Sequence, residues 1–304
     1  DLNACNNNIG RTPAWLAAEQ GQEISIRVLA ELGADLSTPS SDGVTPACIA
    51  AHQGHGTSIR ILAELGADLK ACDDEGRTPA HFAAQTGQIS SIRALAEVGA
   101  DLNACDTVGC SPVYVAAQMG HETSIRVLAE LGADLNACQK DGVTPMCVAA
   151  HQGHGTSIRA LAELGADVNA CDDEGRTPGH LAAQMGQISS IRALAELGAD
   201  LNACNNNIGR TPAWLAAEQG QEISIRVLAE LGADLSTPSS DGVTPACIAA
   251  FQGQDTSIRI LAELGADLNA CDNNSWTPVL SAAAMGQVAS IRALAELGAD
   301  LSTP

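Results

Sequence analysis

The sequence predicts an all-α solenoid, a stack of small helical repeats, and three observations carry this prediction. The dipeptide Thr-Pro recurs along the 304 residues with a step of 33 residues, lengthened once to 34, and Ser111-Pro112 takes its place once. A short alanine-rich segment and a glycine follow each dipeptide. A second apolar stripe then follows and ends at another glycine. Such a period is typical of repeats that are too small to fold alone and are buried by their neighbours.

The first repeat shows how each element is expected to form. Thr12 can cap the first helix through its hydroxyl, and Pro13 occupies the first helical position, where its missing N–H is harmless. We expect this helix to end at Gly21. The second helix carries Ile26 and the apolar residues three and four positions later on one stripe, and it is expected to end at Gly33.

Nine repeats account for the chain, which we interpret as a single solenoid over residues 1–304. Residues 1–5 read as the tail of a preceding repeat. The predicted repeats, numbered 1 to 9 below, are residues 6–39, 40–72, 73–105, 106–138, 139–171, 172–204, 205–238, 239–271 and 272–304.

The motif of the first repeat resembles the ankyrin repeat. Gly-Arg-Thr-Pro-Ala-Trp-Leu-Ala-Ala-x-x-Gly matches that family's signature, which is built on T-P-L-H-x-A with a 33-residue period. The resemblance implies a curved array of helix-turn-helix repeats with β-hairpin-like turns. One departure is Ser25 and its counterparts, which stand where a β-branched aliphatic residue is usual and thin the core.

The signature histidine survives only as His81 and His180. We expect both to be partly buried hydrogen-bonding groups rather than general bases. Trp15, Tyr114 and Trp214 occupy the same position in other repeats and are expected in the core.

A longer period lies above the first, because residues Asp1 to Ala51 recur without change from Asp200 to Ala250. The array therefore grew by copying blocks of three repeats. Neither end carries the polar cap that solenoids normally need. We expect a segment of a longer array, and a processed chain is the alternative.

Composition indicates an intracellular, cytoplasmic protein. No run approaches the about 20 apolar residues of a membrane span, so membrane insertion is not expected. Seven of the eleven cysteines occur once per repeat. Because stacked helices lie about 8–10 Å apart, too far for a disulfide, we expect these to be reduced core residues. They are Cys5, Cys72, Cys105, Cys138, Cys171, Cys204 and Cys271.

The net charge of −21 divides into a framework and a variable part. Each repeat has a framework Arg and Glu such as Arg27 and Glu31, which are four residues apart and expected to pair weakly. The variable positions hold seventeen acids against six bases, and many acids lie in turns, notably residues 73–75 and 172–174. These form either a solvated rim or a surface that repels nucleic acid and steers basic partners.

The sequence indicates no cofactor, no metal and no enzymatic activity. Cys48, His52 and His55 are of the types that bind Zn²⁺, and the pattern returns from Cys147. Gly54 breaks the helix between the two histidines, so the three side chains need not converge. No phosphate-binding loop, nucleophile elbow or carboxylate pair in a plausible pocket is present.

The resemblance to ankyrin repeats implies a concave groove lined by the turn tips and the ends of the first helices. Exposed Met and aromatic side chains there are typical of adaptable protein interfaces. Trp276 stands out because Ser275 replaces the turn glycine, and it either packs on a neighbouring turn or contacts a partner. The candidate partner-binding residues are Arg11, Glu19, His52, Asp74, Glu75, Met119, Lys140, His151, Asp173, Glu174, Met185, Arg210, Phe251, Trp276 and Met285.

Two functions of different classes follow. The first is a protein–protein adaptor whose acidic groove binds a basic or amphipathic segment of a partner protein. The second is a structural spacer that contacts neighbouring subunits of a larger assembly. Variation at groove positions favours the adaptor, and the verbatim copying of residues 1–51 favours the spacer.

Overall fold

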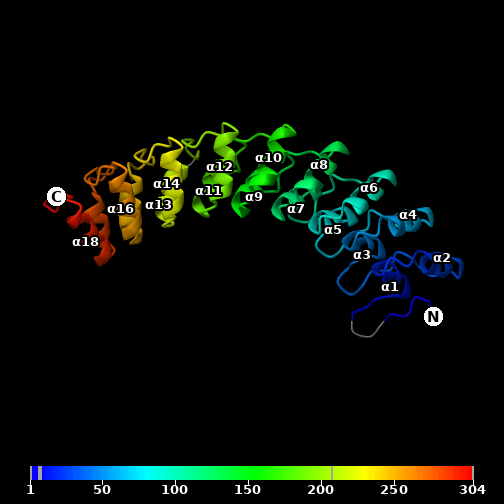
Figure 1. The fold of residues 1–304 in the computed structure, drawn as a ribbon. Coiled ribbons are helices and arrows are strands. Elements are labelled where there is room, and N and C mark those ends of the chain that lie inside the picture. Colours follow the sequence, from blue (N-terminus) through cyan, green and yellow to red (C-terminus); the bar gives the residue numbers. More distant parts are fainter. Residues whose placement is uncertain (1, 6–8, 207, 303–304) are drawn as a thin grey trace. The chain divides into compact units, whose positions relative to one another are not determined.

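The computed structural model describes residues 2–5, 9–206 and 208–302, and within these ranges it contains eighteen helices and no strand (Figure 1). The predicted all-α fold class is confirmed. Helices alternate between a shorter first helix and a nine-residue second helix in each repeat.

Every first helix begins at the proline of the recurring dipeptide. These helices are α1 (Pro13–Glu19), α3 (Pro46–Gln53), α5 (Pro79–Gln85), α7 (Pro112–Gln118), α9 (Pro145–Gln152), α11 (Pro178–Gln184), α13 (Pro212–Glu218), α15 (Pro245–Gln252) and α17 (Pro278–Ala284). Every second helix ends at the framework glutamate. These are α2 (Glu23–Glu31), α4 (Gly56–Glu64), α6 (Ile89–Glu97), α8 (Glu122–Glu130), α10 (Gly155–Glu163), α12 (Ile188–Glu196), α14 (Glu222–Glu230), α16 (Asp255–Glu263) and α18 (Val288–Glu296).

The helix starts follow the capping chemistry predicted from the sequence. The Thr12 hydroxyl accepts a hydrogen bond from the Trp15 N–H at 3.1 Å, and Thr12 itself has an extended backbone. Pro13 then occupies the first helical position. At His81 the same start becomes a reciprocal capping box, because the imidazole Nδ1 accepts from the Thr78 N–H at 3.1 Å.

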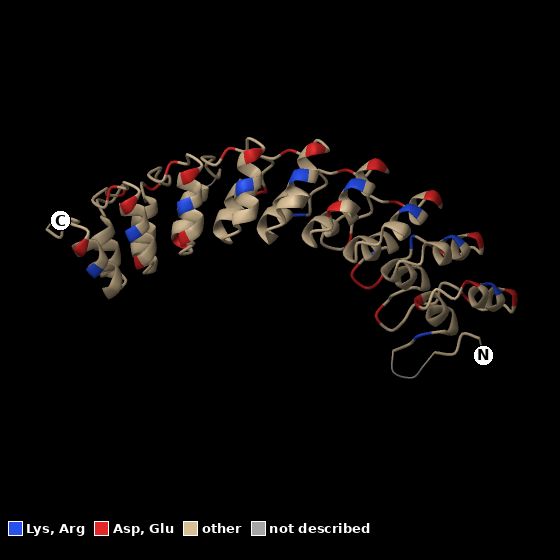
Figure 2. Cartoon of the chain, viewed as in Figure 1, with Lys and Arg blue, Asp and Glu red and all other residues tan. Residues whose placement is uncertain are grey.

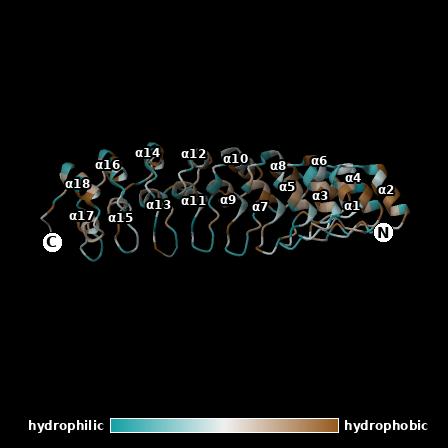
Figure 3. Ribbon diagram, turned by 90° about the horizontal axis from the view of Figure 1, so that it is seen from below, coloured by the Kyte–Doolittle hydropathy of each residue, from teal (hydrophilic) through white to brown (hydrophobic). Residues whose placement is uncertain are grey.

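The chain divides into two compact parts, which are described separately. The N-terminal part comprises Asp1–Pro145 and Glu163–Ala166, and the C-terminal part comprises Met146–Ala162 and Asp167–Pro304. Within each part the first helices of successive repeats pack side by side, and each second helix packs on its own first helix. The loops between repeats project from one side of each part (Figure 3).

Alanines dominate the core where first helices meet. Ala50, Ala51, Ile59 and Leu62 are fully buried in repeat 2. Short side chains allow close approach of helices. The core is thinned as the sequence predicts, because Ser58 is also buried there and its hydroxyl has no hydrogen-bond partner. The same holds for Ser91, Ser124, Ser157, Ser190, Ser224, Ser257 and Ser290.

The expected pairing of Arg27 with Glu31 is wrong. Arg27 Nη2 instead lies 2.9 Å from Glu64 Oε2 on the second helix of the next repeat. A glutamate four residues after an arginine is the less favourable helical orientation, so the guanidinium turns to the neighbouring helix. Figure 2 shows the resulting rows of basic and acidic bands on the second helices. The ladder continues as Arg60–Glu97, Arg93–Glu130, Arg126–Glu163, Arg159–Glu196, Arg192–Glu230, Arg226–Glu263 and Arg259–Glu296.

The expectation that the once-per-repeat cysteines lie in the core is also wrong. All seven are exposed. Cys105, for example, follows the second helix in the segment that leads to the next turn, where Leu102 points inward and is buried. The cysteine side chain faces solvent, and its thiol donates to the Asn103 carbonyl at 3.6 Å. The buried cysteines are Cys48, Cys110, Cys147 and Cys247.

Candidate partner-binding site

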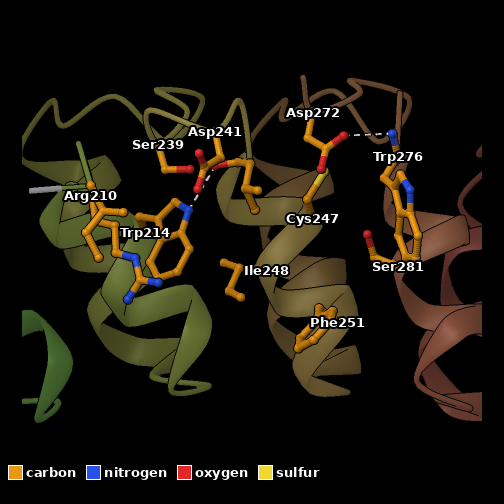
Figure 4. Close-up of a pocket in the computed structure, with 12 residues that line it drawn as sticks. Arg210, Trp214, Ser239, Asp241, Cys247, Ile248, Phe251, Asp272, Trp276 and Ser281 are labelled. Carbon is orange, nitrogen blue, oxygen red and sulfur yellow. Dashed lines mark hydrogen bonds between the residues drawn. The ribbon is translucent and has the colours of Figure 1, made fainter. Parts of the chain in front are cut away.

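Two aromatic side chains singled out from the sequence, Phe251 and Trp276, line one cavity of about 220 Å³ in the C-terminal part of the chain (Figure 4). We call it the aromatic pocket. It is smaller than the cavities that hold drug-sized ligands, and its size suits a single large side chain. Its lining is completed by Ile208, Arg210, Trp214, Ser239, Asp241, Val243, Cys247, Ile248, Asp272 and Ser281.

One wall of the aromatic pocket is built on α13. Trp214 is buried, as predicted, because its indole N–H donates to the Val243 carbonyl at 2.9 Å and its ring packs between repeats. The Arg210 guanidinium lies over this ring, 4.0 Å from its centroid. Arg210 Nη1 is also 3.7 Å from Glu218 Oε1. This predicted groove residue is therefore held by a cation–π contact and an ion pair inside its own repeat.

The opposite wall carries Trp276. This side chain is 42% exposed and Phe251 is 36% exposed, so both present apolar surface. Ser275, directly before the tryptophan, has a φ of 64°, in the left-handed region, and among the described residues it is the only non-glycine with a positive φ. A serine there costs about 1–2 kcal/mol. Backbone strain of this kind is concentrated at functional positions.

The loop side of the aromatic pocket is acidic. Asp272 accepts hydrogen bonds from the Asn274 and Trp276 backbone N–H groups, both at 2.8 Å, and so shapes the turn. Neither Asp272 nor Asp241 forms an ion pair with any residue that the structure describes. The pocket therefore combines uncompensated carboxylates with aromatic faces, which suits a cationic side chain with an aliphatic stem.

The corresponding turns in repeats 3 and 6 explain why Asp272 lacks a cation. There the position of Trp276 is an arginine, and Arg77 Nη2 lies 2.7 Å from Asp73 Oδ2. Arg176 pairs with Asp172 in the same way at 2.8 Å. Tryptophan at position 276 thus removes the neutralising guanidinium and adds an aromatic face in one substitution.

These pairs correct one expectation about the acidic turns. Asp73 and Asp172 are not part of a solvated rim, since they are 5% and 4% exposed. Asp73 Oδ1 accepts from the Glu75 and Arg77 N–H groups, so the carboxylate holds the turn together. The remaining acids of these turns, at positions 74, 75, 173 and 174, are exposed.

A second cavity of about 320 Å³ occupies the equivalent place in the N-terminal part. It lies between the turns of repeats 3 to 5 and the first helices of repeats 3 and 4, and it brings together the candidates Glu75 and Met119 with Gln85 and Tyr114. Here Arg77 and His81 stand where the aromatic pocket has Arg210 and Trp214. It has no exposed aromatic wall of its own.

The other candidates are separate from both cavities. Arg11 lies over the Trp15 ring at 3.9 Å and 3.4 Å from Glu19, and Lys140 Nζ donates to the Thr107 carbonyl. His52 meets the Phe82 ring edge-on. The remaining candidates lie partly or well exposed on first-helix ends and turns; they are Asp74, His151, Asp173, Glu174, Met185 and Met285.

The signature histidines are buried hydrogen-bonding groups, as predicted. His81 Nε2 lies 2.9 Å from the Cys110 carbonyl, and His180 Nε2 lies 2.9 Å from the Arg210 carbonyl. Because Nδ1 accepts from a backbone N–H in both, the ring is neutral and Nε2 is the donor. Burial lowers the pKa of each imidazole below its usual value.

The candidate zinc ligands are engaged elsewhere. Burial raises the pKa of Cys48 to about 11, so this thiol is protonated at neutral pH and is a poor metal ligand. His55 Nε2 lies 3.0 Å from the Glu19 carbonyl in the preceding repeat. Within the described ranges no cluster of three potential ligands is found.

The sequence analysis did not select Asp241 and Asp272, which line the aromatic pocket. The available signal was the combination of a turn aspartate at 272 with tryptophan four residues later, where the related turns have arginine. Ile248 and Cys247 also line the pocket although both are buried. Their apolar character in the sequence predicts only a place in the core.

Comparison with known proteins identifies the class. The family model of ankyrin repeats in three copies matches residues 1–73, 65–138, 131–205, 164–239, 201–272 and 236–304. The chain therefore belongs to the ankyrin-repeat family. Ankyrin repeats are generally protein–protein interaction modules and are typically non-enzymatic.

Among solved structures, the chain is similar to the ankyrin repeat domain of Bcl-3, described as a unique member of the IkappaB protein family. The two share 28% sequence identity with a TM-score of 0.62 over 72% of this chain and 99% of that chain. A search of curated protein sequences finds no match. No helix in the described residues is long and apolar enough to cross a bilayer.

Proposed function

We propose that this chain is a non-enzymatic adaptor that binds a basic, amphipathic segment of a partner protein, with the aromatic pocket as its anchor. The observation that carries the proposal is the pairing of Trp276 with Asp272, a half-exposed aromatic face beside a carboxylate that no described cation neutralises. An arginine or lysine side chain satisfies both, since its stem packs on the ring and its head meets the carboxylate.

The charge distribution supports the same partner chemistry. A net charge of −21 repels nucleic acid and favours encounter with basic segments. Exposed acids such as Glu75 and Glu174 lie in the turns that precede the first helices. Figure 2 shows acidic segments in the loops between helices. Charges of this kind mainly raise association rates, while apolar anchors such as Phe251 mainly slow dissociation.

The buried cysteines and histidines give no support to an enzyme. Burial raises the pKa of Cys110 to about 12, and it also raises the pKa of Cys247 in the wall of the aromatic pocket. Both thiols are protonated at neutral pH, and a thiol rather than a thiolate is a weak nucleophile. The spacer role remains the second candidate, and the unchanged repetition of residues 1–51 favours it.

Selection of displayed random peptides on the immobilised chain tests the adaptor proposal. We expect enrichment of peptides that place Arg or Lys beside an apolar residue, and loss of the enrichment on Trp276→Ala. The matched control is Ile223→Ala, because Ile223 is a 66% exposed apolar residue on α14, outside the aromatic pocket. Equal enrichment on Trp276→Ala and wild type would contradict the proposal.

A further inference from the structure

Repeats 2 and 5 each combine a buried cysteine with an exposed one. Cys48 and Cys147 occupy the position of the signature histidine on α3 and α9, and both are fully buried. Cys72 and Cys171 lie in the non-helical segment that leads into the next repeat, and both are exposed. The two cysteines of each pair are 24 residues apart in the sequence. Both pairs belong to interior repeats, with further repeats on either side.

The buried sulfur lies against the backbone beside its exposed partner. Cys147 Sγ donates to the Ala170 carbonyl at 3.4 Å, and Ala170 directly precedes Cys171. Repeat 8 has the same contact, between Cys247 Sγ and the carbonyl directly before Cys271, also at 3.4 Å. A carbonyl oxygen and the following Cα atom are about 3 Å apart, so each of these sulfurs is within about 6 Å of its partner's Cα atom.

The pair in repeat 2 shows the same proximity through its electrostatics. The pKa of Cys48 is raised to about 11, first by burial and then by the negative charges of Asp73 and Cys72 nearby. Burial also raises the pKa of Cys247, and Cys271 contributes to that rise. The buried thiol is protonated at neutral pH and out of contact with solvent, so the exposed thiol is the one that meets an oxidant first.

The exposed side chains of the two interior pairs can turn toward their partners. Cys72 and Cys171 make no side-chain hydrogen bond with any residue that the structure describes. Cys204 differs, because its thiol is 3.9 Å from the Asn202 carbonyl and His180 stands where the other pairs have the buried cysteine. Rotation about the Cα–Cβ bond therefore redirects the thiol of Cys72 or Cys171 without the loss of a hydrogen bond.

We propose that the buried and the exposed cysteine of each pair form a disulfide, reversibly, when hydrogen peroxide reaches the exposed thiol. The three disulfides are Cys48–Cys72, Cys147–Cys171 and Cys247–Cys271. Each one joins the first helix of a repeat to the segment that leads into the next repeat. Because a repeat contacts only its neighbours, the disulfide stiffens one junction of the array at a time.

The reaction has two steps. The exposed thiolate attacks the peroxide, so that an S–O bond forms, the O–O bond breaks and the displaced hydroxide leaves as water after protonation. The buried thiol then attacks the sulfenic sulfur, an S–S bond forms, and the second hydroxide leaves as water with the proton of that thiol. Two thiols and one peroxide thus give one disulfide and two waters. A thiol reductant reverses the change by thiol–disulfide exchange.

Distance disfavours the other pairings. Exposed cysteines of successive repeats, such as Cys72 and Cys105, are separated by the spacing of the stacked repeats, about 8–10 Å. The Cα atoms of a disulfide are about 4.4–6.8 Å apart. An exposed cysteine therefore reaches the buried thiol of its own repeat and not the exposed thiol of the next one.

Peptide mapping of the oxidised chain tests the proposal. The reduced 304-residue chain is treated with increasing amounts of hydrogen peroxide, the remaining thiols are alkylated, and linked peptides are identified by mass spectrometry without reduction. We expect the three disulfides named above, each with the loss of two hydrogen atoms, and their disappearance after treatment with dithiothreitol. Cys204 has no buried thiol beside it, so its sulfenic acid should persist and be trapped by dimedone.

Matched variants separate the pairs from general thiol oxidation. Cys72→Ser should remove the link to Cys48 and leave the other two, whereas Cys204→Ser, at another exposed cysteine, should leave all three. His180→Cys places a thiol 24 residues before Cys204 and should create a fourth link. In the oxidised wild type, amide exchange of α3 should be about tenfold slower than in oxidised Cys72→Ser, because the link closes a 24-residue loop.

Four results would overturn the proposal. The first is a set of disulfides that joins exposed cysteines of successive repeats or separate copies of the chain in place of the three pairs. The second is dimedone trapping of Cys72 and Cys171 as complete as that of Cys204. The third is the absence of the fourth link in a His180→Cys chain that circular dichroism shows to be folded. The fourth is equal exchange of α3 in oxidised wild type and oxidised Cys72→Ser.

Discussion

Asp73 Oδ2 lies 2.7 Å from Arg77 Nη2 inside a turn, and the same carboxylate accepts backbone hydrogen bonds from residues 75 and 77. Asp73, which the sequence analysis assigned either to a solvated rim or to a partner-steering surface, therefore stabilises the turn from within. Its neighbour Asp74 is exposed and makes no ion pair with the described residues.

The first prediction separates these two acids. Asp73→Ala should lower the free energy of unfolding of repeat 3 by about 2 kcal/mol, because it strips the turn of charge-assisted hydrogen bonds. Asp74→Ala should change it by less than about 0.5 kcal/mol, as exposed substitutions usually do. Hydrogen exchange of the amides in α5 and α6 measures both. Equal effects of the two substitutions would show that the turn does not depend on Asp73.

The second prediction concerns the buried serines, and the verbatim copy supplies its control. Ser224 is buried with an unpartnered hydroxyl, while the identical Ser25 in repeat 1 is exposed. Ser224→Ala should stabilise α14 by about 1 kcal/mol more than Ser25→Ala stabilises α2, since only Ser224 carries a desolvated hydroxyl. Helix propensity affects both alike. Hydrogen exchange of the two helices gives the difference, and a value near zero would mean that the Ser224 hydroxyl is satisfied.

The third prediction concerns the strained turn at Ser275. Ser275→Gly should stabilise repeat 9 by about 1 kcal/mol, because glycine adopts a positive φ without steric cost. The reverse change, Gly242→Ser, should destabilise repeat 8, where a Cβ would meet the Asn273 backbone N at 2.8 Å. Thermal unfolding and hydrogen exchange measure the change in stability that each of the two substitutions causes. Loss of stability in Ser275→Gly would refute the assignment of strain to this residue.

The fourth prediction is a pH dependence. Burial lowers the pKa values of His81 and His180 below the ordinary value of a histidine side chain. As the pH falls through the unfolded value, the unfolded chain binds protons that the folded chain does not, so stability declines. His81→Gln/His180→Gln should show a smaller decline between about pH 7.5 and 5.5. An unchanged slope of unfolding free energy against pH would assign the proton uptake to other groups.

Interactions between residues close in sequence predict most of the fold. The features that the sequence analysis did not predict depend on packing between repeats. The cap at Thr12 and the proline start depend on residues a few positions apart, so the sequence shows them directly. The partner of Arg27 lies 37 residues away in the next repeat, and helix spacing alone points to Glu31 instead. The exposure of Cys105 depends on the path of a non-helical segment, which periodicity does not describe.

The site was predicted only in part for the same reason. Phe251 and Trp276 follow from the sequence because exposed aromatic side chains at groove positions are typical of adaptable interfaces, and Trp276 also because Ser275 replaces the turn glycine beside it. Asp272 lacks the ion pair that the corresponding aspartates form in repeats 3 and 6. This difference depends on side-chain contacts within the turns, which a periodic sequence pattern does not describe. Arg11 and Arg210, by contrast, were chosen as contact residues and are held on the tryptophans of their own repeats.

The fifth prediction concerns the roles of charge and apolar contact in binding. Reversal of Glu75 and Glu174 should slow association with a selected basic peptide and weaken its salt dependence, because both acids are exposed on the turns. Phe251→Ala should speed dissociation instead. Stopped-flow kinetics at several salt concentrations distinguishes the two effects. If reversal of Glu230 on the second helices had the larger effect, the binding surface would be on the other layer.

We propose that Trp276, beside the unneutralised carboxylate of Asp272, forms the anchor for a cationic side chain. The most direct measurement is calorimetric titration of a selected basic peptide into the Ser275→Gly/Trp276→Arg chain, which recreates the Gly76-Arg77 turn and supplies Asp272 with its own guanidinium. We expect this chain to be at least as stable as wild type and to bind the peptide at least tenfold more weakly, because it has lost a central aromatic anchor. Unchanged affinity in this stable chain would contradict it.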